Sequence, residues 1–318
     1  MLSFFVLLVK GQKVMVTGGF SNYNYAKTTE VIDLANPNNA CQNMAKLINL
    51  REGAVGGLIK QKWPLICGGY PAVDQKNCEV IGGMPDEMEL KLELLERRRW
   101  AASQVWIDEQ LWVTGGIEGP SITSEIVNIV DGKVATSVML PLYIGDHCLV
   151  QVTSDLFLLI GGIGGGLNEQ NISDETWWFS IGTFGWSKGP KLNQARRNHA
   201  CAVFKDLTTN NTVVAVVGGS NSTTSDLLDS VEVFDGKSWK YGPKLPVPLE
   251  SSKMVSKEFS GVLMGGYDGS FPTSVMRELT CEFGTCFWRK MSQKLEEPRR
   301  DFVAMIIPDS LANCTNES

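Results

Sequence analysis

Histidine is the side chain most often recruited for catalysis and metal binding at neutral pH, and this chain of 318 residues has only two, His147 and His199. Each stands at the start of a short strand-like segment of small and apolar residues. No tyrosine stands beside either one, and no cluster of carboxylates accompanies them. We therefore expect each histidine to hydrogen-bond within its own turn, and we expect no catalytic residue, no metal site and no cofactor.

Aromatic and arginine side chains recur in two other kinds of segment. The aromatic residues stand in polar loops that follow Gly-Gly pairs, and the arginines stand in turns that precede strands of small residues. Tyrosine together with arginine is the composition favoured at the energetic centres of binding interfaces. The expected binding face comprises Phe20, Tyr23, Tyr25, Tyr70, Tyr267, Phe271, Arg51, Arg98, Arg197 and Arg300. For the arginines, structural support of the loops is an equal alternative.

The elements that position these residues form a repeat. A Gly-Gly pair preceded by an apolar strand recurs six times, at intervals of 46 to 57 residues. The pairs end at Gly19, Gly69, Gly116, Gly162, Gly219 and Gly266. Each pair is followed by a polar loop and a strand that carries an acidic residue, and a turn and a strand of small residues close the unit. Glycine suits crowded strand ends because it accepts a positive φ and close backbone approach.

This pattern resembles the kelch repeat, whose period is about 50 residues and whose unit is one four-stranded propeller blade. The resemblance covers nearly the whole chain and is to secreted kelch proteins that lack BTB and BACK regions. It implies an all-β fold, a six-bladed β-propeller of four-stranded antiparallel blades over residues 13–308, with a C-terminal tail at 309–318. The family's tryptophan is present only in the last three units, as Trp186, Trp239 and Trp288, where we expect it to pack between blades.

A propeller must not leave an open sheet edge. We expect the C-terminal inner strand, 302–307, to join the N-terminal strand that begins at Lys13 and so complete blade 1. That assignment leaves the apolar run 2–9 without a place in the ring. We therefore expect residues 1–12 to be a signal peptide or the remnant of one; the alternative is that this run is the first strand of blade 1.

The eight cysteines gain meaning from this arrangement. In a secreted propeller we expect disulfides across the hairpin at Cys281–Cys286, between consecutive strands at Cys67–Cys78, and across the ring closure at Cys41–Cys314. Cys148 and Cys201 occupy matching positions of neighbouring inner strands, and we expect buried thiols there. The alternative is that all eight are thiols of a cytoplasmic propeller. Five sequons favour secretion and N-glycosylation, at Asn171, Asn210, Asn221, Asn313 and Asn316.

The net charge of −6 argues against a nucleic-acid surface, which needs a basic face. No apolar run approaches the roughly 20 residues that span a bilayer. We expect a secreted, non-enzymatic scaffold whose loops bind a protein or a glycan. The alternatives are a propeller enzyme, such as one similar to the copper-dependent galactose oxidases, and an intracellular kelch interaction protein.

Overall fold

The computed structural model describes residues 13–22, 24–71, 77–83, 101–107, 110–116, 123–128, 133–164, 171–222 and 226–316. Their regular structure is almost entirely β-strand, arranged in several small antiparallel sheets, with one 3-10 helix at Asp309–Leu311. Among these residues, no helical segment has the length and apolar character that a membrane crossing requires. The expected signal peptide, 1–12, lies outside the described residues.

Six sheets contain most of the strands, and we number them in chain order. Sheet 1 is β28 (Val303–Ile307), β1 (Lys13–Thr17) and β4 (Thr29–Asp33); sheet 2 is β6 (Val55–Ile59), β7 (Trp63–Cys67) and β8 (Cys78–Val80). Sheet 3 is β9 (Ser103–Ile107), β10 (Gln110–Thr114), β11 (Thr123–Asn128) and β12 (Lys133–Met139). Sheet 4 is β14 (Cys148–Gln151), β15 (Leu156–Ile160), β18 (Thr176–Ser180) and β19 (Gly185–Lys188).

Sheet 5 is β20 (Ala200–Lys205), β21 (Thr212–Val217), β22 (Val231–Phe234) and β23 (Trp239–Tyr241). Sheet 6 is β24 (Lys253–Ser256), β25 (Ser260–Met264), β26 (Val275–Glu282) and β27 (Thr285–Lys294). Shorter pairings join β2 (Phe20–Ser21) to β3 (Asn24–Tyr25), and β5 (Asn39–Cys41) to β29 (Cys314–Asn316). A further small sheet comprises β13 (Ile144–Gly145), β16 (Ile163–Gly164) and β17 (Asn171–Ile172).

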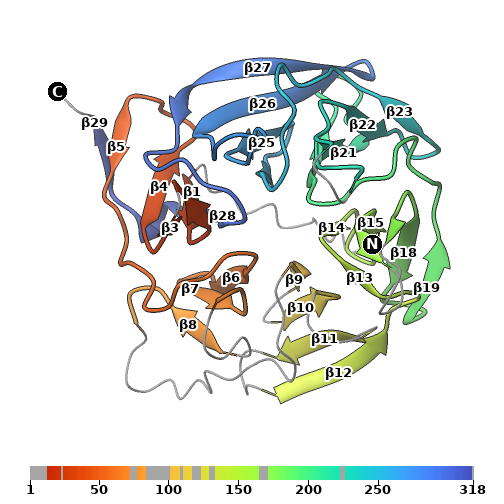
Figure 1. The fold of residues 1–318 in the computed structure, drawn as a ribbon, viewed down its shortest axis with the longest axis horizontal. Coiled ribbons are helices and arrows are strands. Elements are labelled where there is room, and N and C mark those ends of the chain that lie inside the picture. The colour runs from red at the N-terminus through yellow and green to blue at the C-terminus, as the bar shows by residue number, and fades with distance from the viewer. Residues whose placement is uncertain are drawn as a thin grey trace, which may run out of the picture.

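In each of the six sheets, the strand named first above lies nearest the centre of the molecule (Figure 1). We call β28, β6, β9, β14, β20 and β24 the inner strands. Each contacts the inner strands of the two neighbouring sheets, in the cycle β28–β6–β9–β14–β20–β24 and back to β28. The six sheets therefore surround a shared centre in chain order.

The predicted pairing of the two chain ends is confirmed. β28 lies antiparallel to β1, with Ile307 opposite Lys13 and Val303 opposite Thr17. Sheets 1 and 2 have three strands each among the described residues rather than the four expected. β5 contacts the sheet at β4 but pairs in register with β29.

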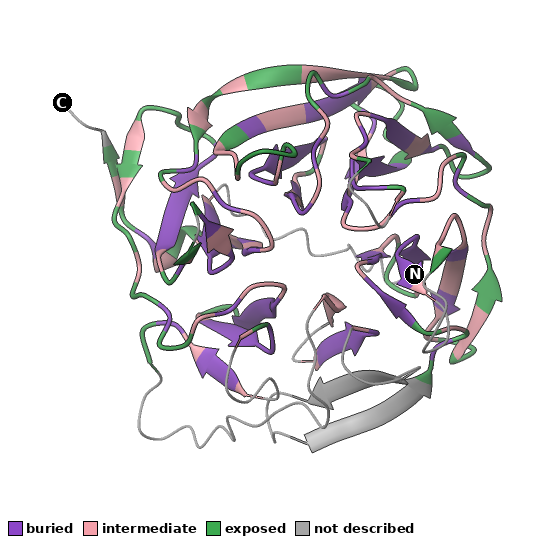
Figure 2. Cartoon of the chain, viewed as in Figure 1, coloured by how far each residue is buried: buried purple, intermediate pink, exposed green. Residues whose placement is uncertain are grey.

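The apolar core is divided into six clusters, each between two neighbouring sheets. Alternation along the strands explains this division, because successive side chains point to opposite faces. In β1, Met15 packs in the cluster toward sheet 2, whereas Val14 and Val16 pack in the cluster toward sheet 6. Buried residues are concentrated in the inner and middle strands, and exposed residues in outer strands such as β19 and β27 (Figure 2). Both faces of each sheet are therefore covered.

The tryptophans of the last units lie at these inter-sheet contacts, as expected. Trp239 is buried in the cluster between sheets 4 and 5, and Trp288 packs against the cluster between sheets 5 and 6. Their indole N–H groups make equivalent bonds to the preceding unit: Trp239 donates to the carbonyl of Pro190 and Trp288 to that of Pro243. The repeat is thus visible in hydrogen bonding as well as in sequence.

Candidate binding site at the mouth of the central channel

The Gly-Gly pairs and the arginine-containing turns meet at one end of the six sheets, which we call the mouth. The second glycine of a pair donates its N–H to a turn carbonyl of the next sheet, as Gly19 does to Arg51 at 2.7 Å and Gly162 to Arg196 at 2.8 Å. Gly162 has a φ of +102°, and a Cβ there would lie 2.6 Å from the carbonyl oxygen of Gly145. Glycine is required because both the φ and the spacing exclude a side chain.

A closed ring of six backbone hydrogen bonds lies at the mouth. It surrounds the entrance to the space between the six inner strands, which we call the channel. Each member has a positive φ, from 51° to 60°, and each both donates to one neighbour and accepts from the other. The N–H groups of Gly53, Ala101, Asp146, Asn198, Ser251 and Asp301 donate to the carbonyls of Asp301, Gly53, Ala101, Asp146, Asn198 and Ser251 at 2.7, 3.0, 2.9, 2.9, 2.8 and 3.0 Å, respectively. One turn from each sheet contributes one residue, so the ring couples all six sheets.

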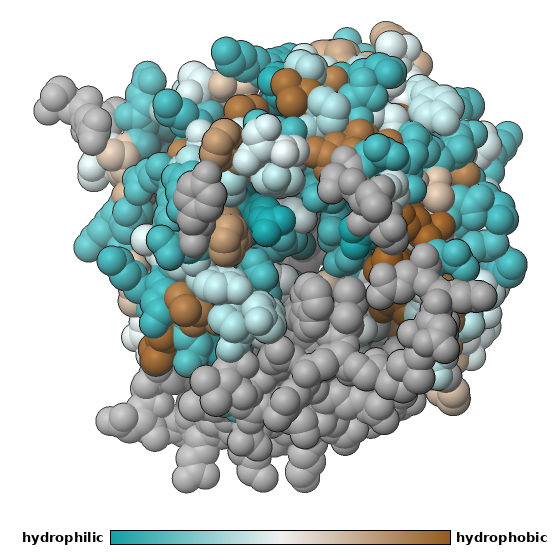
Figure 3. Space-filling model, in the orientation of Figure 1, coloured by the Kyte–Doolittle hydropathy of each residue, from teal (hydrophilic) through white to brown (hydrophobic). Residues whose placement is uncertain are grey.

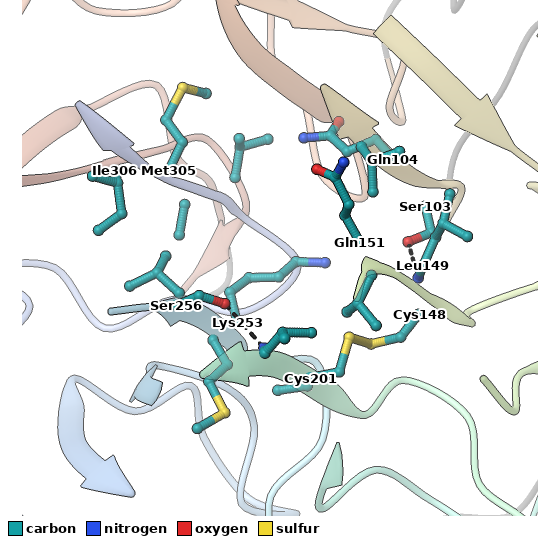
Figure 4. Close-up of a pocket in the computed structure, with 18 of the residues that line it drawn as sticks. Ser103, Gln104, Cys148, Leu149, Gln151, Cys201, Lys253, Ser256, Met305 and Ile306 are labelled. Atoms are coloured by element: carbon teal, nitrogen blue, oxygen red, sulfur yellow. Dashed lines mark hydrogen bonds between the residues drawn. A yellow bond between two sulfur atoms is a disulfide. The ribbon is translucent and has the colours of Figure 1, made fainter. Parts of the chain in front are cut away.

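Below the ring, the inner strands enclose a cavity of about 490 Å³. Polar side chains of the inner strands accept hydrogen bonds from backbone N–H groups of the neighbouring inner strands. Ser103 accepts from the N–H of Leu149 at 2.7 Å, and Ser256 accepts from that of Val203 at 3.1 Å. Figure 4 shows Lys253 extending across the cavity, with Gln104 and Gln151 on the facing wall.

At the ring itself lies a second cavity of about 390 Å³, the mouth cavity. Its charged lining comprises Glu52, Asp146, Asp301, Arg197, Arg300 and Lys253, and its remaining lining includes both histidines, Asn198, Ser251 and Ser252. Lys253 lines both cavities and so connects the mouth with the channel. The site is therefore rich in charge of both signs within a small volume.

Five of the predicted binding residues come together beside this cavity. The guanidinium carbon of Arg300 lies 5.2 Å from the ring centroid of Phe20 and 5.3 Å from that of Tyr267. Tyr25 packs edge-on against Phe20 at 5.3 Å between centroids and lies 6.3 Å from Tyr70. Cation–π contact of this kind holds a guanidinium in place while leaving its N–H fork open to a ligand.

The other predicted face residues divide into three groups. Arg197 lies at the mouth and pairs with Asp146 at 3.5 Å. Phe271 is exposed on the Tyr267 loop, in which Tyr267 bridges to Pro272. Tyr23 and Arg98 lie outside the described residues.

The assignment of Arg51 to the binding face is wrong. Its side chain is fully buried, its Nε lies 2.6 Å from Glu79, and its Nη1 donates to the carbonyls of Gly68 and Asn77. Arg196 with Glu232, and Arg299 with Glu30, form the same buried pair in their sheets. Arg51 is thus equivalent to Arg196 and Arg299, which directly precede the mouth arginines Arg197 and Arg300.

The corresponding mouth position after Arg51 is Glu52, which sequence reasoning missed. It also missed Asp146, Glu250, Asp301 and Lys253. In the structure, the residue that directly follows each buried turn residue forms a β-bridge with the residue that directly follows a Gly-Gly pair. The signal in the sequence was therefore a fixed position within the repeat. The pairs are Arg300 with Phe20, Glu52 with Tyr70, Arg197 with Ser220 and Glu250 with Tyr267. Alignment of the units on the glycines would have exposed this position.

Burial changes the protonation of the mouth carboxyls. Desolvation, and then the Asp301 carboxylate, raise the pKa of Glu52 to about 7, and Arg300 opposes that rise. Desolvation and Asp301 likewise raise the pKa of Asp146 to about 7 against the opposing charge of Arg197. The pKa of Glu250 is also raised, chiefly by burial. At neutral pH Glu52 and Asp146 are therefore partly protonated.

The two histidines differ from the expectation that each bonds within its own turn. Nε2 of His147 lies 2.9 Å from Oγ1 of Thr114, in β10 of the neighbouring sheet. His199 is buried, and desolvation followed by the charge of Arg196 holds its pKa well below the usual range. Within the described ranges, no group of three His, Cys, Asp or Glu side chains is placed to hold a metal ion.

All eight cysteines lie in four disulfides. The expected pairs Cys41–Cys314, Cys67–Cys78 and Cys281–Cys286 are confirmed. The expectation of buried thiols at Cys148 and Cys201 is wrong, because the two form a disulfide between β14 and β20 on the channel wall (Figure 4). The inner strands of neighbouring sheets are close enough for this bond, with a Cα–Cα distance of 6.3 Å.

The sequon asparagines are accessible where the structure describes their side chains. Asn171, Asn210, Asn221 and Asn313 are exposed, and the side chain of Asn316 is outside the described part. In the view of Figure 3, hydrophilic residues cover most of the coloured surface and apolar residues form small separate groups. The accessible asparagines are compatible with glycan attachment.

Comparison of the sequence with models of protein families gives no match. Comparison with curated proteins also gives no match.

Proposed function

We propose that the six sheets are the blades of a six-bladed, kelch-type β-propeller. Three features support this: the closed cycle of inner-strand contacts, the six core clusters between neighbouring sheets, and the ring of six equivalent backbone hydrogen bonds. The recurrence of one buried Arg–Glu pair and one Gly-Gly latch per repeat supports the kelch assignment. The pairing of β28 with β1 closes the ring in this proposal.

The mouth of this propeller is a non-enzymatic binding surface for a protein or a glycan. The observation that carries this role is Arg300 held between Phe20 and Tyr267, beside Tyr25 and Tyr70. Aromatic and arginine side chains that are ordered before binding lose little conformational entropy when a partner docks. Tyr70 and Phe271, with 45% and 55% of their surface exposed, extend the surface outward.

The protein acts outside the cell or in another oxidising compartment. Four disulfides that include every cysteine of the chain support this location, because such bonds persist where thiols are not kept reduced. The accessible sequons are consistent with passage through the secretory pathway. A cytoplasmic location would require these pairs to be thiols.

Among the described residues, no specific site favours the enzyme alternative. The galactose-oxidase-like chemistry considered above needs a tyrosine cross-linked to a cysteine, and here every cysteine is in a disulfide. The mouth carboxyls with raised pKa values share their cavity with Arg197, Arg300 and Lys253.

Expression in a secretory cell, followed by probing of protein and glycan arrays, tests this function. The secreted wild type should bind a partner, and Arg300→Gln should weaken that binding while leaving the melting temperature within a few degrees of wild type. Phe283→Ala, on an exposed hairpin turn far in sequence from the mouth segments, is the control and should bind normally. Loss of binding in Phe283→Ala but not in Arg300→Gln would refute the mouth as the binding surface.

A further inference from the structure

The wall of the mouth cavity contributed by sheets 5 and 6 holds buried polar atoms without a protein partner. Two of them, Oγ of Ser252 and Nε of Arg197, belong to residues that line the cavity. A third, Oε2 of Glu250, lies two residues before Ser252, next to the lining. Ser252 is 2% exposed and lines the cavity. Buried polar atoms are nearly always hydrogen-bonded, because leaving one unpaired costs about 1–3 kcal/mol. A partner from outside the chain is therefore expected at this wall.

The three atoms require a partner that both donates and accepts. The Arg197 nitrogen donates, the Glu250 oxygen accepts when ionised, and the Ser252 hydroxyl does either. A ligand hydroxyl has the same two capacities as the water molecule that it displaces, so its exchange for water loses few hydrogen bonds. An alkyl or aromatic ligand group would leave all three atoms unpaired.

The charge of the mouth favours a neutral ligand. Arg197, Arg300 and Lys253 are positive, and they face the carboxyls of Glu52, Asp146, Glu250 and Asp301. Since the pKa values of Glu52 and Asp146 are about 7, each of these two carboxyls is about half protonated at neutral pH. Side chains of both signs thus line the same small cavity, so neither a strongly acidic nor a strongly basic ligand would meet charge of one sign there.

An aromatic pair, Tyr70 and Tyr25, lies next to the lining residue Glu52, at the edge of the cavity. Tyr70 pairs through its backbone with Glu52, at 2.7 and 2.9 Å, and its ring lies beside that of Tyr25. Tyrosine offers a flat apolar face together with a polar edge. The cavity volume of about 390 Å³ falls within the range of small-molecule sites, about 300–1,000 Å³.

From this combination we infer that the mouth cavity binds a neutral, polyhydroxylated ligand, a sugar residue of a glycan. Its hydroxyls bond to Ser252, Glu250 and Arg197, and its apolar face packs toward Tyr70. This inference rests on the proposed role of the mouth as a binding surface, and it commits that role to one chemical class. The mixed charges, the unpaired buried atoms and the aromatic pair each exclude a different alternative.

Saturation-transfer NMR with methyl glycosides tests the inference on the purified, disulfide-intact protein. The panel holds neutral glycosides of glucose, galactose, mannose, fucose, xylose, N-acetylglucosamine and N-acetylgalactosamine, with glycosides of glucuronic acid and N-acetylneuraminic acid for comparison. At least one neutral glycoside should bind with a dissociation constant in the millimolar range or below. Binding of acidic glycosides alone would overturn the inference.

Two variants locate the site. Ser252→Ala should weaken the bound glycoside about fivefold, the effect of one neutral hydrogen bond, without lowering the melting temperature, because it removes a hydroxyl that has no partner in the protein. Tyr70→Ala should weaken it by at least as much, whereas Tyr241→Ala, a more exposed tyrosine on β23, should leave it unchanged. Equal binding by Ser252→Ala and wild type would place the sugar elsewhere and refute the inference.

The outcomes also separate this inference from the proposed function. If no neutral glycoside binds while a protein partner is captured in a manner that depends on Arg300, the sugar inference is wrong and the binding role stands. If neither arrays nor glycosides give any binding, both are wrong.

Discussion

The disulfide Cys41–Cys314 joins strand β5 to strand β29, and its removal tests how these two distant segments are held together. The two cysteines lie opposite each other in the β5–β29 pairing and are separated by 273 residues. Cys281 and Cys286 also lie opposite each other in an antiparallel pairing, but only 5 residues apart. The two bonds therefore differ mainly in the length of chain that each one closes.

Loop-closure entropy gives the expected magnitudes. At 25 °C the relation predicts about 5.5 kcal/mol for a loop of 273 residues and about 2 kcal/mol for one of 5 residues. The double variant Cys41→Ala/Cys314→Ala should therefore lose about 3.5 kcal/mol more free energy of unfolding than Cys281→Ala/Cys286→Ala. Cys281 is fully buried, so its replacement also loses packing, which works against the predicted order.

The assay is equilibrium unfolding in guanidinium chloride without reductant, followed by tryptophan fluorescence and extrapolated linearly to water. The m-value must be shared by the variants for the free energies to be compared. If the short-loop variant loses as much stability as the long-loop variant, or more, the entropic account of the ring closure is wrong.

Three further outcomes follow from buried groups at the mouth. Arg196→Met leaves Glu232 buried without its cation, so the free energy of unfolding should fall by about 3–5 kcal/mol in chemical denaturation. Arg197→Met, one residue later and at a partly exposed side chain, should lower it by about 1 kcal/mol or less. Equal losses would contradict the corrected assignment of the arginines. Gly162→Ala meets the Gly145 carbonyl and should lower the melting temperature more than Gly236→Ala, which has a similar positive φ but no atom within 4 Å; the reverse order would remove the close-approach argument. The pKa of Asp146 is raised from 3.8 to about 7, so the folded state keeps a proton that the unfolded chain releases, and this carboxyl's contribution to stability is present below pH 4 and lost as pH rises toward 7. The wild type should therefore lose stability relative to Asp146→Asn between pH 4 and pH 8 in parallel denaturation series, and a constant difference would refute the shift.

The sequence was informative wherever the backbone itself restricts the residue type. The Gly-Gly pairs were visible because positive φ and close approach exclude other residues, as at Gly162. The partner of β1 could be predicted because residues 302–307 repeat a strand type that had no other place. Three disulfides followed from strands that are adjacent in the chain or meet at its ends.

The sequence was less informative where tertiary distance decides the chemistry. Arg51 and Arg197 both precede a small-residue strand, and only the burial of Arg51 against Glu79 separates their roles. Cys148 and Cys201 occupy matching positions, but whether they bond depends on the spacing of β14 and β20. The mouth carboxyls come from separate turns, and their shared desolvation arises only when the turns converge.

The ring at the mouth has an evolutionary consequence. It is made wholly of main-chain atoms, and its six positions hold five residue types: glycine, alanine, asparagine, serine and, twice, aspartate. A polar or charged side chain at one of these positions can change without removing any of the hydrogen bonds that hold the turns. Descendants of such a gene could thus exchange one ligand for another by single substitutions, with selection on recognition largely uncoupled from selection on folding.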